Sequence, residues 1–326
     1  MKFRTEITPS LLRRPIGWQE RILAVGSCFA EEIARRLAAS KFHIAINPSG
    51  VLFNPASIAR AMERWSREEL FDREEVRRSV VDGQRWFLYD LHGSFSEASP
   101  EALLRRAESA LRAGSQALRE ADRVLVTFGT AWVYELRETG CVVANCHRQP
   151  RDLFTRRRLS VEEIVAQWSL LIEGPLRGKQ VLMTLSPIRH LADGAEENSL
   201  SKATLRLAIA ELQARFPEVE YFPAYELLMD DLRDYRFYGE DLVHPSSQAA
   251  DYVWEKFAEA ALSPALREAL PRLEEIRKAM AHRPLHPESE AYRAFCSAAL
   301  RKVLSLEETY RIDLSEEKAF FAEKID

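Results

Sequence analysis

Five short apolar runs, separated by segments of helical periodicity, limit the folds open to this chain more than any other feature. Continuous apolar runs of this length are typical of parallel strands that are buried on both faces. Their alternation with helices predicts an α/β protein: a doubly wound parallel sheet of about five strands with helices on both faces. The expected strands lie within residues 21–26, 41–48, 122–129, 180–187 and 219–225.

The first run leads directly to Ser27 at the start of a helix. Ile22–Val25 is continuously apolar, Gly26 lets the backbone bend, and apolar residues then recur at helical spacing. In open α/β sheets ligands bind outside the carboxyl ends of the strands, where a helix N-terminus offers free N–H groups to an anion. Ser27 is therefore a candidate nucleophile. On this segment alone a helix N-cap is the simpler interpretation, because serine is favoured there.

A second polar group follows more than two hundred residues later, in Asp241-Leu-Val-His244. Pro245 and a helical run come next, which predicts His244 as the N-cap of that helix, where the positive helix end favours a neutral imidazole. Asp241 can accept the Nδ1 proton and set the tautomer of a general base. Taken alone, His244 is as well explained as a cap. Together with Ser27, the pair favours catalysis, because both groups should meet at one sheet edge.

The residues that carry this chemistry also carry a resemblance to a known family. Gly26-Ser-Cys-Phe-Ala30 is the signature of the GSCFA family, a branch of the GDSL/SGNH hydrolases, and the sequence resembles it across about residues 18–262. The resemblance implies a flavodoxin-like three-layer fold and cofactor-free hydrolysis of an ester or related acyl bond. It implies Ser27 as nucleophile, with His244 and Asp241 completing a triad. Other matching segments are Asn47-Pro48, Leu52–Pro55, Phe128–Tyr134, Asn145–His147, Ser186–His190 and Tyr221–His244.

The resemblance also implies an oxyanion hole, and here the sequence departs from the pattern. Two donors have counterparts, the N–H groups of Ser27 and Gly50. The third, an Asn side chain after the third strand, is missing, because Gly129 is followed by Thr130. Losing one such donor costs on the order of a hundred-fold in rate. We expect the Thr130 hydroxyl to replace it; the alternatives are Asn47, Asn54 and Asn145.

Several other assignments stay open at this stage. Cys28 is the nucleophile if the register slips by one residue. Arg148–Arg158 is a basic run that indicates a solvated face or an anionic substrate. No metal is expected, because His147 with Cys141 and Cys146 lacks a fourth ligand. The residues expected to contact substrate are Asn47, Asn54, His147, Arg189 and His190.

The competing class of function is a binding module for a glycan, an acyl group or a protein partner, using the same sheet edge without turnover. The presence of Ser27, Asp241 and His244 together weighs against it, since a binder has no need of all three. The expected ligand of an enzyme is a small acylated molecule, such as an acylated sugar or another anionic ester. Homo-oligomerisation is left open.

Charge and composition exclude some other classes. A net charge of −4 argues against a broad nucleic-acid surface. Four cysteines do not make a disulfide framework, and no apolar region follows Met1. No run reaches the roughly 18 apolar residues of a membrane span. We expect a cytoplasmic protein without a membrane span.

The domain organisation follows from where the strand signals stop. Residues 1–262 form the expected α/β domain, and 263–326 a helical C-terminal extension that docks on it or at a subunit contact. The charged stretch 67–78 is expected to be a solvated helix. Hairpin insertions are expected around Asp82-Gly83 and across 132–147.

Overall fold

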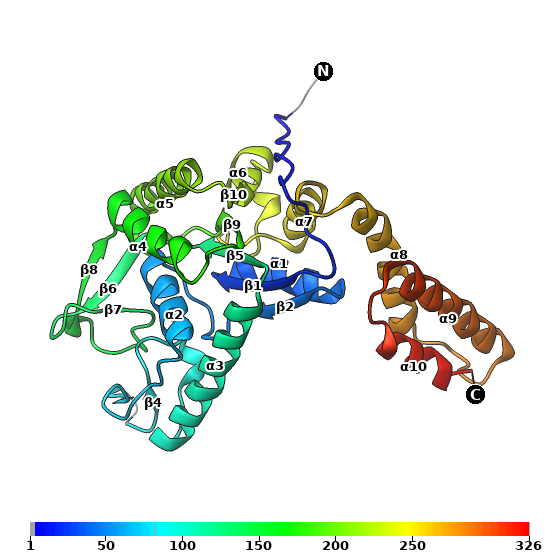
Figure 1. The fold of residues 1–326 in the computed structure, drawn as a ribbon, viewed down its shortest axis with the longest axis horizontal. Helices are drawn as coiled ribbons and strands as arrows, with labels where there is room; N and C mark the ends of the chain where they lie inside the picture. The colour runs from blue at the N-terminus through cyan, green and yellow to red at the C-terminus, as the bar shows by residue number, and fades with distance from the viewer. Residues whose placement is uncertain (1–3, 82, 326) are drawn as a thin grey trace.

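The computed structural model describes residues 4–81 and 83–325 and contains the predicted parallel sheet. Its strand order is β10-β9-β5-β1-β2 (Figure 1), which is the flavodoxin-like order and confirms the predicted fold class. The chain order reverses between β1 and β5, and ligands bind at such a point in open sheets. The strands are β1 (Arg21–Gly26), β2 (His43–Ile46), β5 (Arg123–Phe128), β9 (Gln180–Leu185) and β10 (Val219–Phe222).

Alternation along the strands divides the core into two layers. In β1, Ile22 and Ala24 pack with α1 and α7, whereas Leu23 and Val25 pack on the opposite face against α2, α4 and α5. A sheet covered on both faces needs apolar residues at every position, which explains the continuous runs. The helices of these two layers are α1 (Cys28–Ala39), α2 (Pro55–Arg67), α3 (Pro100–Glu120), α4 (Val161–Glu173), α5 (Ala195–Arg215), α6 (Ala224–Glu226) and α7 (Ser247–Ala261).

Two small antiparallel sheets form the insertions, and they differ from the expectations in extent. β3 (Arg77–Arg78) pairs with β4 (Trp86–Phe87), so the predicted hairpin is present, although Asp82 lies outside the described residues. The stretch 67–78 is not a helix: α2 ends at Arg67 and turns follow, with Glu68 in a left-handed conformation.

The second insertion contains a strand that was not predicted. β6 (Trp132–Leu136) pairs with β7 (Val142–Val143), as expected, and also with β8 (Phe154–Arg158). The basic run is thus partly strand, with Arg157 bonded to Glu135 and Arg156 stacked 3.8 Å from the centre of the Trp132 ring. These contacts indicate a structural role for its last arginines.

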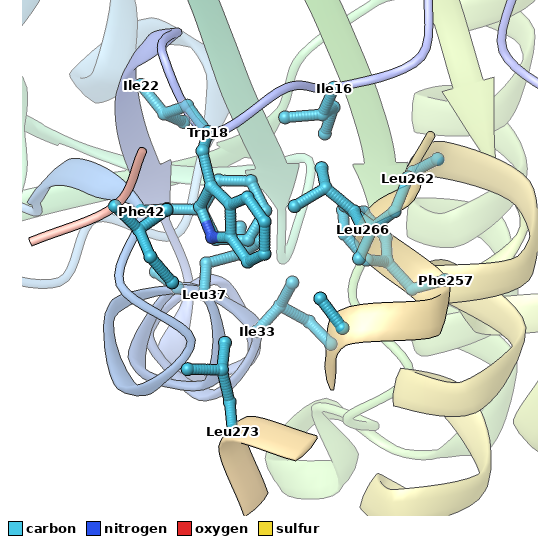
Figure 2. Close-up of a cluster of buried hydrophobic side chains, with 14 of the residues drawn as sticks. Ile16, Trp18, Ile22, Ile33, Leu37, Phe42, Phe257, Leu262, Leu266 and Leu273 are labelled. Atoms are coloured by element: carbon cyan, nitrogen blue, oxygen red, sulfur yellow. The ribbon is translucent and has the colours of Figure 1, made fainter. Parts of the chain in front are cut away.

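The C-terminal helices lie beside the α/β body, on the side where α7 and β2 lie (Figure 1). They are α8 (Pro264–Ala281), α9 (Glu290–Tyr310) and α10 (Ser315–Glu323). Trp18 packs between Phe42 and Tyr310, with ring centroids 6.2 Å and 5.2 Å away. Lys41 adds an ion pair to Glu317 at 2.7 Å. Figure 2 shows side chains of α1 (Ile33, Leu37), α7 (Phe257) and α8 (Leu266, Leu273) in this same cluster.

No helix within 4–81 and 83–325 is both long and apolar enough to cross a membrane.

Candidate active site

Ser27 occupies the junction of β1 and α1, as predicted, but its hydroxyl does not cap the helix. It is the N-cap residue by position, and its side chain makes no capping hydrogen bond. The residue is 1% exposed, and within the described residues its Oγ has no hydrogen-bond partner. Leaving a buried hydroxyl unpaired costs about 1–3 kcal/mol. A buried polar atom without a partner needs an explanation, and a functional role of the Ser27 hydroxyl is one.

The turn that presents Ser27 can be made only with glycine at position 26. Gly26 has φ of 132°, and a Cβ there would lie 2.2 Å from the Thr127 carbonyl oxygen. The Gly26 N–H donates to Asn47 Oδ1 at 2.9 Å. Asn47 is 7% exposed and itself in a left-handed conformation, so it supports the turn from within the protein. Its side-chain oxygen is therefore engaged within the protein, and its contact with substrate stays a prediction.

Asp241 and His244 form a hydrogen-bonded pair, as the spacing predicts. His244 Nδ1 lies 2.5 Å from Asp241 Oδ2. Asp241 Oδ1 accepts the N–H groups of His244 and Val243, each at 2.9 Å. The backbone hydrogen bonds, with that from the His244 N–H first, lower the pKa of Asp241 to about 2. An ionised Asp241 keeps the proton on Nδ1, which leaves Nε2 of a neutral imidazole free to accept a proton.

His244 is not the helix cap that the sequence predicts. Helix α7 begins at Ser247, and its N-cap is Ser246, whose side chain accepts the Ala249 N–H. His244 instead lies in a tight loop in which the Gly239 N–H donates to the His244 carbonyl at 2.8 Å. The imidazole is therefore held by Asp241 rather than by a helix end.

No hydrogen bond joins the described side chains of Ser27 and His244. Ser27 follows the carboxyl end of β1, and the loop of the Asp–His pair is bonded through the Leu242 carbonyl to Arg189, which follows the carboxyl end of β9. Ser27 Oγ is buried without a partner, while the His244 side chain is 55% exposed. The structure therefore holds an assembled Asp–His pair and a separate buried hydroxyl, with no Ser27–His244 hydrogen bond among the described residues.

The three donors expected in the oxyanion hole each have a hydrogen-bond partner inside the protein. The Ser27 N–H donates to Thr127 O at 3.2 Å, and the Gly50 N–H closes a turn onto Asn47 O at 2.7 Å. Thr130 Oγ1 lies 3.1 Å from Ser201 Oγ and accepts the Trp132 N–H. The expected hole is thus absent as a set of free donors. At the start of α1 the Ala30 N–H donates to the Ser27 carbonyl at 2.8 Å. The N–H groups of Cys28 and Phe29 precede the first i→i−4 acceptor of the helix and are the replacement donors that the helix start offers.

Two more of the residues expected to contact substrate have partners inside the protein. Asn54 accepts the Ser57 N–H at 2.8 Å and caps α2. His147 stacks on Phe87 with ring centroids 4.3 Å apart, and its Nε2 lies 2.9 Å from Leu88 O. Burial lowers the pKa of His147 to about 4, so the ring is neutral at physiological pH.

The remaining two, Arg189 and His190, follow β9 at the carboxyl edge of the sheet. His190 lies edge-on to Phe53, with ring centroids 5.8 Å apart. Arg189 Nη2 donates to the Leu242 carbonyl at 2.7 Å, inside the loop of the Asp–His pair. The structure thus brings Arg189 to the candidate site.

Sequence reasoning missed Lys202, a buried lysine of α5. Its Nζ donates to the carbonyls of Gly129 and Ser186, each at 2.7 Å, and so joins the ends of β5 and β9. Burial lowers its pKa to about 7. The signal was present in the sequence, since Lys202 falls on the buried stripe of α5 that also contains Ser201, Leu205 and Leu212.

The surroundings of Cys28 bear on its role as the alternative nucleophile. Burial and the neighbouring Glu31 raise the pKa of the Cys28 thiol, which disfavours the thiolate that nucleophilic attack requires. In the part of the chain that the structure describes, no group of three or more His, Cys, Asp or Glu residues is placed to hold a metal ion.

Fold and site together define a flavodoxin-like α/β protein with a serine at the carboxyl end of its first strand. The chain belongs to the GSCFA family: the sequence profile described as "GSCFA family" matches residues 21–257. A second profile, "GSCFA domain protein, C-terminal domain", matches residues 273–326. No curated protein matches the chain.

Proposed function

We propose that this protein is a serine hydrolase that acts on ester or related acyl bonds of a small substrate. Ser27 is the nucleophile, His244 the general base and Asp241 the residue that orients His244. The observation that carries the proposal is the unpartnered, buried Ser27 Oγ at the N-terminus of α1, in a chain that also holds a hydrogen-bonded Asp241–His244 pair tied to the segment after β9. A structural serine would use its hydroxyl to cap the helix or to bond the backbone.

The reaction runs through a covalent acyl-enzyme. Ser27 Oγ attacks the substrate carbonyl carbon while His244 Nε2 takes the hydroxyl proton. The tetrahedral oxyanion collapses, the bond to the leaving oxygen breaks, and His244 returns the proton to that oxygen. Water then repeats the sequence on the acyl-enzyme and releases the acid. The charge on Asp241 stabilises the imidazolium that forms in each half.

The exposed position of His244 defines what substrate binding must accomplish. Ser27 Oγ has no partner and His244 is more than half exposed, so the loop must bring Nε2 to the hydroxyl for proton transfer. Catalytic hydrogen bonds that are long or unformed without substrate commonly tighten in the complex. The proposal includes a cytoplasmic location and a small acylated substrate, such as an acylated sugar.

A fluorophosphonate probe tests the nucleophile directly. We expect modification to map to Ser27, to be lost in Ser27→Ala, and to slow by about a hundred-fold or more in His244→Ala. Cys28→Ala is the matched control, because it changes the adjacent side chain and should label at the wild-type rate. Labelling that persists in Ser27→Ala would contradict the assignment of the nucleophile.

A second function, a binding module without turnover, is favoured by one observation. The N–H of Gly50 and the hydroxyl of Thr130 are already hydrogen-bonded within the protein, which leaves the oxyanion without those donors. If the wild-type protein is inert to the probe and hydrolyses no ester in a broad panel, this reading replaces the hydrolase.

A further inference from the structure

We propose that Arg189 is a positioning residue that holds the Asp241–His244 loop over the carboxyl edge of the sheet. The inference deepens the proposed hydrolase and rests on it for the catalytic consequence. It replaces the expectation that Arg189 contacts substrate.

The loop that carries the pair needs an external support. Leu242 lies between Asp241 and His244 with φ of 55°, and a non-glycine residue in this region costs on the order of 1 kcal/mol or more. Leu242 is also 50% exposed, so its side chain contributes little packing. The hydrogen bonds of Asp241 lie within the loop and set its shape, but they do not attach it to the sheet.

Arg189 supplies that attachment through contacts with two parts of the loop. Its Nη2 donates to the Leu242 carbonyl at 2.7 Å, in the middle of the Asp–His segment. Its guanidinium carbon lies 4.8 Å from the centre of the Tyr238 ring. Tyr238 pairs in turn with Pro245, directly after His244. One planar guanidinium therefore contacts the loop at two places, the Tyr238 ring at its start and the Leu242 carbonyl at its centre. A lysine ammonium does not reproduce this geometry.

The backbone on either side of Arg189 is itself fixed by α5. The Ser186 carbonyl accepts Lys202 Nζ at 2.7 Å, and the His190 N–H donates to Asn198 Oδ1 at 2.9 Å. Ser186, Lys202 and Asn198 are each at most 5% exposed. Arg189 thus starts from a rigid base, and a side chain held at both ends restricts where His244 can lie relative to the end of β9.

Hydrogen exchange tests the support without reference to activity. The N–H groups of Gly239, His244 and Ser246 are hydrogen-bonded within residues 237–246. In Arg189→Ala we expect exchange in this segment to accelerate by about ten-fold or more, with the rest of the sheet unchanged. Arg236→Ala is the matched control, because Arg236 lies nearby, pairs with Asp234 and is 70% exposed. Unchanged exchange in Arg189→Ala would overturn the proposal.

The probe rate at Ser27 tests whether the support acts through His244. We expect Arg189→Ala to slow labelling by about ten-fold or more, and Arg189→Lys to give an intermediate rate. In a His244→Ala background, Arg189→Ala should have no further effect, whereas a general structural role would slow labelling again. If Arg189→Ala labels at the wild-type rate while His244→Ala labels slowly, the positioning role of Arg189 is refuted and the hydrolase stands. If the wild-type protein does not react with the probe at all, the hydrolase is refuted. Hydrogen exchange then tests separately whether Arg189 holds the loop.

Discussion

At the scale of the single residue, Lys202 is a buried lysine that links two strand ends near the candidate site. Its ammonium donates to the carbonyls of Gly129 and Ser186, each one residue beyond a strand of the sheet, β5 and β9. Thr130 directly follows the first of these carbonyls, and Arg189 lies three residues after the second. Removing a charged group from water disfavours its charged form, which is why the pKa of Lys202 falls to about 7. In the unfolded chain the same amine has the ordinary value near 10.4.

This difference predicts a pH dependence of stability. Between pH 7 and about 10 the unfolded chain binds the lysine proton and the folded protein does not, so stability should rise with pH, by at most about 1.4 kcal/mol per unit. Lys202→Met lacks this contribution. Urea unfolding of both proteins should show that the free energy of unfolding of the wild type, relative to that of Lys202→Met, is larger at pH 9.5 than at pH 7.5. An equal difference at the two pH values would indicate that Lys202 stays protonated in the folded protein.

At the scale of the element, the β1–α1 turn leaves no room for a side chain at position 26. The Gly26 carbonyl accepts the Leu52 N–H and its own N–H goes to Asn47, so the turn is fixed from the β2 side. On the other side it lies against Thr127 of β5. The turn that presents Ser27 is therefore a contact among three strands rather than a free loop.

Gly26→Ala should break this element. A Cβ cannot lie 2.2 Å from a backbone oxygen, and alanine strongly disfavours φ of 132°. We expect a loss of about 3 kcal/mol or more, measured as a lowered thermal midpoint or as failure to fold. Gly17→Ala is the control, because nothing lies within 4 Å of its Cβ position. Equal midpoints for the two variants would contradict the geometry.

At the scale of the whole molecule, the C-terminal helices share a core with the α/β body. Trp18 is 7% exposed and lies in the same cluster as side chains of α1, α7, α8 and α9 (Figure 2). Burial of this kind couples the stability of the two parts, because neither can expose its face without cost. The division at residue 262 remains a prediction.

Trp18→Ala tests that coupling. A buried tryptophan removed from a core costs about 3–5 kcal/mol, and here the loss falls on the contact with Tyr310. We expect limited proteolysis of the variant to cut first between α8 and α9, near the 93% exposed Leu285, and to release the helices. Trp86→Ala, in the β3–β4 insertion, should leave this cleavage pattern unchanged. The same pattern in both variants would mean that the parts are independent.

Interactions within a few residues were predictable from the sequence, because both partners stand in the pattern. The Asn54 cap of α2, the Ser160–Glu163 capping box of α4 and the Asp241–His244 hydrogen bond each join residues that are three positions apart. The three central strands, β1, β5 and β9, were predictable for a related reason: burial on both faces leaves a nearly continuous apolar run.

Only the tertiary structure decided what each polar group at the sheet edge does, because their partners lie far away in the chain. Thr130 bonds Ser201, Asn47 bonds Gly26, and Arg189 reaches Leu242 across 53 residues. The cap of α7 is a different case, because its signal is local: Ser246 accepts the N–H of Ala249 three residues on, and serine is a favoured cap. A polar side chain can satisfy its hydrogen bonds with many partners, so sequence identifies the residues and folding selects the partner.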